Sequence, residues 1–303
     1  MKVITDDLQF PEGPVCLPDG SFLVVEIRRG TLTRVQPDGK KHYVAKLGGG
    51  PNGAAIGPDG HAYVCNNGGF NWREVHGRIE PMGTPADYTS GRIERVNLDT
   101  GKFDVLYHTD GSRPLRGPND IVFDAHGGFW FTDLGKSRGR QFDFGAVCYA
   151  RADGSMVREV LFPMWQPNGV GLSPDGKTLY VAESATCRLW AWDISAPGEV
   201  ARGPEPCPPH GGRLLFSSST WRRYDSLAVE AGGNICIGTL DIGGISVCRP
   251  EGGELAFVAM PNHHATNICF GGAGMQKAYI TSSHAGLLLE ADWPRPGLRL
   301  RHA

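Results

Sequence analysis

The sequence lacks long hydrophobic runs, an excess of charge of one sign, and helical periodicity. Its 303 residues carry 30 Lys and Arg against 32 Asp and Glu, a formal net charge of −2, which argues against a nucleic-acid or anionic-membrane surface. No stretch approaches about 18 uninterrupted apolar residues, and the N-terminal MKVITDDLQF has no apolar core of a signal peptide. We therefore expect a cytoplasmic globular protein, a monomer or small homo-oligomer, with neither nucleic acid nor membrane as a partner.

The cysteines show no CxxC spacing, so the sequence offers no thiolate metal site. The eight cysteines are scattered, and several lie in apolar runs such as NICIG at 234–238 and NICFG at 267–271. Cysteines in such runs are typical of buried, reduced thiols in a cytosolic protein. We predict free thiols rather than disulfides.

Short apolar runs separated by turn residues are what the sequence does contain. The 43 Gly and 22 Pro residues punctuate these runs, which is typical of many short strands joined by tight turns. Three segments are close copies of one another: GPNGAAIGPDG at 50–60, GPNDIVFDAHG at 117–127 and QPNGVGLSPDG at 166–176. In each, a polar residue stands eight positions before the turn glycine. The same spacing leads from Gly20 to Glu12, from Gly233 to Asp225, and from Gly274 to Thr266, with Asn267 beside it.

Each of these turns is followed by a second apolar run, a loop and a third run. A fourth run is visible in most units, for example at 41–47 and 103–108. Four antiparallel strands that recur six times, at intervals of about 40–65 residues, predict an all-β, six-bladed β-propeller. We expect one domain over residues 1–303. Either KVIT near the N-terminus or LRLRHA at the C-terminus supplies the outer strand that closes the last blade.

The repeat predicts that six polar positions converge on the propeller axis, because the first strand of each blade lines the central channel. These positions are Glu12, Asn52, Asn119, Asn168, Asp225, and Thr266 or Asn267. Asn and Asp also favour turns, but Glu is a poor turn former, so turn formation does not explain Glu12. Two carboxylates buried together repel each other, and a divalent cation neutralises them. The oxygen donors suit one Ca²⁺, Mg²⁺ or Mn²⁺ ion, and Zn²⁺ and Fe²⁺ stay open as alternatives.

The loops between second and third strands open on the same face as these positions and are expected to form the rim of a pocket. The longest, at 66–91, is either a lid that sets specificity or a surface embellishment. Candidate rim residues are Asn66, Asn67, Asp133, Glu183, Asp241 and His284. His263 and His264 point to opposite sides of an extended segment, so they cannot chelate one ion together, and we expect both to face solvent. Trp165 and Tyr224, just before two ligand positions, either wall the pocket or pack in the core.

At these residues the chain resembles the senescence marker protein, gluconolactonase and luciferin-regenerating enzyme family. The shared landmarks, in order along nearly the whole chain, are EGPV at 12–15, PND at 118–120, FTD at 131–133, PNGVGLSPDGKTLYVAES at 167–184, DSLAVE at 225–230 and TNICFGG at 266–272. The resemblance implies a six-bladed propeller with one divalent metal on its axis. It implies that Glu12, Asn168 and Asp225 hold the metal. Asn119 is implied to contact substrate, or to be a fourth ligand as in related phosphofluoridases.

The resemblance and the repeat together predict a metal-dependent lactonase whose substrate is a small-molecule lactone. The ion would polarise the lactone carbonyl and acidify a water molecule. Asp225 is the expected general base, and Asn119 is expected to orient the substrate. The further expected substrate contacts are Arg116, Asn52 and Asn66. Two alternatives remain: a phosphotriesterase or phosphofluoridase-like hydrolase that uses the same metal site, and a non-enzymatic metal-binding propeller.

Overall fold

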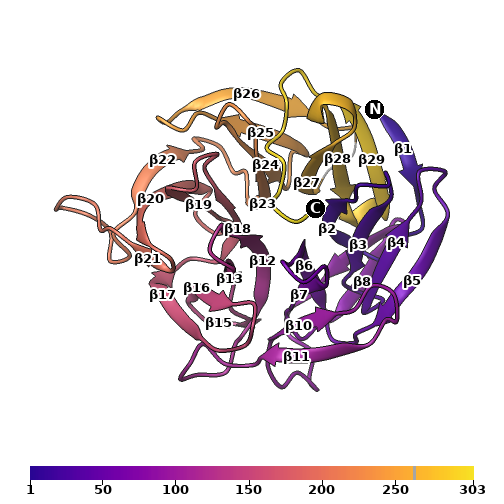
Figure 1. Cartoon of the computed structure of the whole chain (residues 1–303), viewed down its shortest axis with the longest axis horizontal. Helices are drawn as coiled ribbons and strands as arrows, with labels where there is room; N and C mark the ends of the chain where they lie inside the picture. The colour runs from indigo at the N-terminus through magenta and orange to yellow at the C-terminus, as the bar shows by residue number, and fades with distance from the viewer. Residues whose placement is uncertain (262–263) are drawn as a thin grey trace.

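The computed structural model describes residues 1–261 and 264–303 and confirms the six-bladed β-propeller (Figure 1). Each blade is an antiparallel sheet, and the strand nearest the axis comes first along the chain. These innermost strands are β2 (Pro11–Cys16), β6 (Pro51–Ile56), β12 (Pro118–Phe123), β18 (Pro167–Leu172), β23 (Tyr224–Val229) and β27 (Ala265–Gly271). Each contacts the innermost strand of the next blade, and β27 returns to contact β2, so the six form a closed ring.

The remaining strands follow in the predicted order outward from the axis. The second strands are β3 (Phe22–Glu26), β7 (Ala62–Asn66), β13 (Gly128–Asp133), β19 (Thr178–Glu183), β24 (Ile235–Thr239) and β28 (Lys277–Ser282). The third strands are β4 (Thr31–Val35), β10 (Arg92–Val96), β16 (Gly145–Arg151), β20 (Arg188–Ala196), β25 (Gly244–Cys248) and β29 (Leu287–Asp292). The outermost strands are β5 (Lys41–Lys46), β11 (Phe103–Tyr107), β17 (Val157–Met164), β22 (Arg213–Ser217), β26 (Glu254–Ala259) and β1 (Lys2–Thr5).

The N-terminal segment closes the last blade, which decides between the two possibilities left open by the sequence. Strand β1 pairs antiparallel with β29, with Lys2 opposite Glu290 and Val3 opposite Leu289. The C-terminal segment instead runs toward the axis, where Figure 1 marks the end of the chain. There the amide of Leu298 donates to the carbonyl of Val229 at 2.9 Å. The first and last segments of the described chain therefore have different roles.

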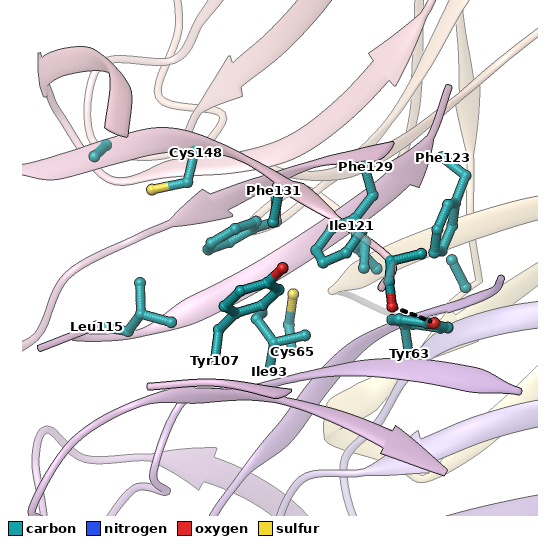
Figure 2. Packing of buried hydrophobic residues seen from close by; sticks show 14 residues of the cluster. Tyr63, Cys65, Ile93, Tyr107, Leu115, Ile121, Phe123, Phe129, Phe131 and Cys148 are labelled. Carbon is teal, nitrogen blue, oxygen red and sulfur yellow. Dashed lines mark hydrogen bonds between the residues drawn. The ribbon is translucent and has the colours of Figure 1, made fainter. Parts of the chain in front are cut away.

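The blades are held together by apolar clusters between neighbouring sheets. Figure 2 shows one of them, between blades 2 and 3, where Tyr63, Ile93 and Phe129 are fully buried. The hydroxyl of Tyr63 reaches across and donates to the carbonyl of Ala152 at 3.0 Å. Strand residues that alternate toward two neighbouring blades explain why the strands read as nearly continuous apolar runs. All eight cysteines lie among the described residues and none forms a disulfide, as predicted.

Few elements lie outside the blades. Strand β21 (Glu199–Val200) extends blade 4, and two short hairpins, β8 (Trp72–Val75) with β9 (Arg78–Pro81) and β14 (Ser137–Arg138) with β15 (Gln141–Phe142), stand on loops between second and third strands. Two 3₁₀ segments, η1 (Ala273–Met275) and η2 (Ser283–Ala285), flank β28. Among the described residues, no helix is long and apolar enough to cross a membrane.

Every innermost strand is irregular at the same place. The ladder to the second strand shifts register between Glu12 and Val15 in β2, and equivalent shifts occur in the other five innermost strands. A bulge of this kind redirects a side chain without ending the strand. The repeated bulge lies beside the polar residue at the second position of five of these strands, and beside Thr266 and Asn267 in β27.

Neighbouring innermost strands approach closely at these bulges, and glycine makes the approach possible. A Cβ on Gly13 would lie 2.7 Å from the amide nitrogen of Ala54, and one on Gly169 would lie 2.7 Å from the carbonyl of Asp225. Real Cβ atoms do not come this close to backbone, so the Gly of the repeated Pro-Asn-Gly is required by packing. The repeated glycine in the sequence is thus explained by the close packing of neighbouring innermost strands.

Candidate metal centre and active site

Each innermost strand carries a polar residue near its start, and these strands form the closed ring around the central channel. We name this set the axial ring: Glu12, Asn52, Asn119, Asn168, Asp225 and Asn267. All six residues are buried, with exposed fractions between 2% and 9%. The face of the propeller on which the ring opens, together with the loops between second and third strands, is referred to below as the site face.

The two carboxyl groups of the axial ring lie in an environment that disfavours charge. Burial raises the pKa of Glu12 to about 7, although Asn267 donates to its Oε2 at 2.9 Å and the amide of Gly13 donates to the same atom at 2.9 Å. Burial, and next the charge of Glu12, raise the pKa of Asp225 well above its ordinary value. Two neighbouring buried acids with raised pKa values are typical of a site built for a positive charge.

The carboxamides of the ring are oriented by different means. The amide nitrogen of Asn168 donates to the hydroxyl of Ser184 at 3.1 Å, which leaves its Oδ1 to accept from Ser226 at 3.4 Å. The Oδ1 of Asn119 is buried and has no hydrogen-bond partner within the described structure. A buried amide oxygen without a donor is unfavourable by itself and indicates that something else is meant to contact it.

Asp120 is a site residue that the repeat did not single out. Its carboxylate accepts from the amides of Ile121 at 3.0 Å and Val170 at 3.1 Å, and burial raises its pKa to about 7. A signal was present, because this position carries Gly in blades 1, 2 and 4. An Asp at a position where the neighbouring strands demand glycine must place its side chain in the channel.

The chemistry of these residues suits a divalent cation, because their buried carboxylates lack a positively charged partner in the described part of the chain. The ring offers two buried carboxylates and an unpartnered carboxamide oxygen, and no ion pair within residues 1–261 and 264–303 involves Glu12, Asp120 or Asp225. Over the same described ranges, no group of three or more His, Cys, Asp or Glu is placed to hold a metal. A cation on the axis would therefore need amide oxygens as well as the two carboxylates, which are ligands of hard cations.

Three of the six expected rim residues, Asn66, Asp133 and Glu183, accept hydrogen bonds from the loop that precedes the innermost strand. Glu26, Asn66, Asp133 and Glu183 are the last residues of the second strands in blades 1 to 4, and we name them the strand-end anchors. Each is buried and accepts a hydrogen bond from an amide just before the proline that begins the innermost strand of its own blade. The donors are Gln9 to Glu26, Gly50 to Asn66, Arg116 and Gly117 to Asp133, and Trp165 to Glu183.

The contacts of Asn66 speak against the prediction that it binds substrate. Its exposed fraction is 0%, and its Oδ1 accepts from Gly50 at 2.8 Å. Its amide nitrogen donates to the carbonyl of Gly48 at 2.9 Å and to Glu94 at 3.0 Å. Both polar atoms are engaged by the protein, so none is left for a ligand. Asp133 and Glu183 are corrected as rim residues for the same reason.

The other three expected rim residues, Asn67, Asp241 and His284, contact other side chains of the protein. The carboxylate of Asp241 pairs with Arg223 at 2.7 Å, next to β23. The ring of His284 stacks on that of His264 with centroids 3.6 Å apart. His264 is half-buried rather than facing solvent, while His263 lies outside the described residues. Asn67 is buried and accepts from the ammonium group of Lys136 at 3.3 Å.

Three residues expected near the pocket fall at different depths. Tyr224 is fully buried in the core of blade 5, and Trp165 is 43% exposed. Arg116 has an exposed side chain on the loop that leads to Asn119, while its carbonyl accepts from the hydroxyl of Tyr88. Its role as a substrate contact stays a prediction. Asn52 is in the ring itself.

The 66–91 loop extends over the neighbouring blades. Arg28 of blade 1 pairs with Glu74 of the β8–β9 hairpin at 2.6 Å. The ring of Phe10 contacts Trp72 of the hairpin and His284 of blade 6, with centroids 5.2 Å and 5.5 Å apart. The hairpin therefore spans blade 1 and reaches η2 on blade 6. The hairpin thus covers part of the site face.

Comparisons with known proteins agree with this architecture. The gluconolactonase of Zymomonas mobilis subsp. mobilis is 25% identical over 315 residues, covering 94% of this chain and 79% of the relative. The diisopropyl-fluorophosphatase of Loligo vulgaris is 24% identical over 325 residues, covering 97% and 92% of the two chains. The crystal structure of regucalcin from Agrobacterium tumefaciens, a calcium-binding protein, superposes with a TM-score of 0.71 at 18% identity, covering 99% and 100%.

A family model gives the assignment. The model described as SMP-30/Gluconolactonase/LRE-like region matches residues 10–284. This range begins just before the first axial residue and ends in η2, so it takes in the whole axial ring. The chain therefore belongs to the SMP-30/gluconolactonase/LRE-like family.

Proposed function

We propose that the protein is a metal-dependent hydrolase that opens a lactone at the axial ring. The observation that supports this proposal is the ring itself: Glu12 and Asp225 are buried, the charge of Glu12 raises the pKa of Asp225, and the buried Oδ1 of Asn119 has no hydrogen-bond partner among the described residues. The relation to a gluconolactonase over 94% of the chain supports the reaction class. The relation in fold to a calcium-binding regucalcin supports the cation.

Glu12, Asn168 and Asp225 are the residues that would hold the ion, with Asn119 as a substrate contact or a fourth ligand. When bound, a divalent cation supplies Lewis acidity toward a carbonyl and lowers the pKa of water. Its identity stays open among Ca²⁺, Zn²⁺, Mn²⁺, Mg²⁺ and Fe²⁺. Asn168 is fixed for this purpose because Ser184 holds its amide nitrogen.

Asp225 is proposed to take the proton from the attacking water. In the protein alone, burial and the charge of Glu12 raise the pKa of Asp225 well above its ordinary value, which disfavours the carboxylate that a base requires. A nearby positive charge lowers the pKa of a carboxyl group and restores the base. Asn119 and the exposed Arg116 would hold the lactone while its ring opens, and Asn52 would contact it from blade 2.

The test is lactone hydrolysis by metal-stripped protein, followed by proton release in weak buffer. Each of the five ions is added back over a panel of sugar and aliphatic lactones. We expect activity to return with metal and to be lost in Glu12→Gln, which keeps the shape and removes the charge. Hydrolysis that needs no metal, or that survives in Glu12→Gln, would contradict the proposal.

A second candidate is the hydrolysis of phosphotriesters or fluorophosphates at the same site. The similarity to the squid diisopropyl-fluorophosphatase, over 97% of this chain, favours it specifically. Both reactions use a polarised ester and an activated water, so substrate profiling separates them. Tight metal binding without turnover of either class would favour a non-enzymatic metal-binding propeller.

A further inference from the structure

Four aromatic side chains form a continuous exposed patch on the site face, at the junction of blades 3 and 4. We name them the aromatic strip: Phe142, Phe144, Phe162 and Trp165, each 43% or 44% exposed. The ring of Trp165 lies 4.9 Å from that of Phe144 and 5.4 Å from that of Phe142, between centroids. The ring of Phe144 lies 6.3 Å from that of Phe162. The four rings are thus in one chain of contacts.

The strip leads from the outer edge of the propeller to the axial ring. Phe162 belongs to β17, the outermost strand of blade 3. Trp165 stands three residues before Asn168, which is at most about 10 Å of extended chain. Gly145, which follows Phe144, lies so close to Pro167 that no Cβ would fit between them. The inner end of the strip is therefore beside an axial residue.

The backbone holds the strip in position. Phe142 pairs with Ser137 in the β14–β15 hairpin. Between the two phenylalanines, the amide of Asp143 donates to the carbonyl of Lys136 at 2.8 Å, and its side chain pairs with Arg138 at 3.4 Å. The amide of Trp165 donates to the strand-end anchor Glu183 at 2.8 Å. A surface fixed in this way loses little conformational freedom when a ligand binds.

Exposed aromatic residues elsewhere in the described chain do not gather in this way. Tyr43 and Phe103 stand on the outermost strands β5 and β11. Tyr43 is covered on one face by the guanidinium group of Arg29, 5.3 Å from its ring centroid. Single exposed apolar residues are ordinary, whereas a contiguous apolar patch marks a binding surface.

We propose that the aromatic strip binds an apolar substituent of the substrate, so that the preferred lactones carry an alkyl or aryl chain rather than hydroxyl groups alone. This inference rests on the proposed lactonase function. The ester would lie at the polar axial ring, and the chain would extend outward over the rings. Binding energy from such a remote group favours reaction at the centre when the group positions the ester.

The experiment compares two lactones of the same ring size, one unsubstituted and one with a hexyl or phenyl group, on the metal-loaded protein. We expect a higher kcat/KM for the substituted lactone. In Trp165→Ala this preference should fall by about tenfold or more, the usual effect of removing an aromatic contact from a binding surface. The kcat/KM for the unsubstituted lactone should fall by less than that for the substituted lactone.

Three further arms make the result specific. Trp165→Phe should restore most of the preference, because it keeps an aromatic ring. Phe103→Ala, an exposed aromatic on an outer strand, should leave it unchanged. Calorimetric binding of the hexyl-substituted lactam, which is not hydrolysed, should weaken in Trp165→Ala by a factor similar to that in kcat/KM.

Each contrary outcome has a distinct meaning. Equal kcat/KM for both lactones in the wild-type protein would overturn the strip proposal and leave the lactonase function standing. No hydrolysis of either lactone would overturn both. Self-association that Phe142→Ala abolishes, measured by sedimentation, would show that the strip is an interface between copies of this chain and would overturn the substrate role.

Discussion

The axial ring and the strand-end anchors are two sets of buried polar residues on the same blades, and they are used in opposite ways. Each anchor meets donors from its own blade: Glu26, for example, accepts from Gln9, Arg29, Thr31 and Thr33. Burial raises the pKa of both ring carboxyls, the charge of Glu12 raises that of Asp225 further, and the Oδ1 of Asn119 has no donor among the residues that the structure describes. Satisfied polar groups stabilise a fold, whereas groups left unsatisfied indicate a ligand.

The comparison also explains how the two sets depend on each other. An anchor fixes the amide just before the proline of the innermost strand, and the ring residue follows that proline. The anchors therefore position the ring without touching its ligand. Changes in the axial ring should affect activity most, whereas changes in the anchors should affect stability most.

Asp225→Asn should abolish activity and spare the fold. The substitution keeps an oxygen ligand and removes the proton acceptor, so we expect kcat for lactone hydrolysis to fall about a thousandfold. In metal-free protein the unfolding free energy should stay the same or rise, because one of two repelling acids is gone. Turnover and urea unfolding on the same preparation measure both. Full turnover would exclude Asp225 as the base.

Glu26→Ala should show the reverse pattern. Removing this 1%-exposed carboxylate leaves the amide of Gln9 without its acceptor, the hydroxyls of Thr31 and Thr33 with only each other, and the guanidinium of Arg29 without its carboxylate partner. We expect a loss of about 3 kcal/mol in unfolding free energy by urea titration. Asp38→Ala, an exposed acid paired with Lys40, is the matched control and should change stability little. An equal loss in both variants would remove the distinction between anchor and surface acid.

Gly169→Ala tests the tight ring of strands. The new Cβ would lie 2.7 Å from the carbonyl of Asp225 and 2.7 Å from the amide nitrogen of Leu227, so β18 and β23 must separate. We expect a loss of about 2 kcal/mol, as for overpacked core positions, together with weaker metal binding. Gly232→Ala, where a Cβ meets nothing within 4 Å, is the control and should be nearly neutral. Calorimetry of both variants checks the pair.

The pH dependence of stability follows from the raised pKa values. The pKa of Glu12 rises from 4.5 to about 7 on folding, so the folded state holds this proton more tightly than the unfolded state does. Metal-free protein should therefore lose stability as pH rises from about 4.5 to about 7. Thermal melting across this range measures it. Glu12→Gln should reduce the dependence without abolishing it, because burial also raises the pKa of Asp120 and Asp225, and a rise in stability with pH over this range would contradict the account.

The sequence was sufficient to predict the fold, because each blade repeats one bulge, while the role of the six axial positions stays a prediction. The same logic failed at Asp120, which occupies a glycine position in only one blade. It also failed at Asn66, Asp133 and Glu183. A polar residue at a strand end looks the same in sequence whether it faces a pocket or a neighbouring amide. Only the path of the loop before the innermost strand decides which of the two applies, and the residue types do not reveal that path.

The most direct test of the central claim is a calorimetric metal titration of stripped wild-type protein beside Glu12→Gln and Asn66→Asp. Asn66→Asp adds a carboxylate to an anchor position without touching the axial ring. We predict one divalent ion per chain in the wild-type protein, no comparable binding in Glu12→Gln, and in Asn66→Asp, if it remains folded by circular dichroism, unchanged stoichiometry. Undiminished binding in Glu12→Gln would show that the axial ring is not the metal centre.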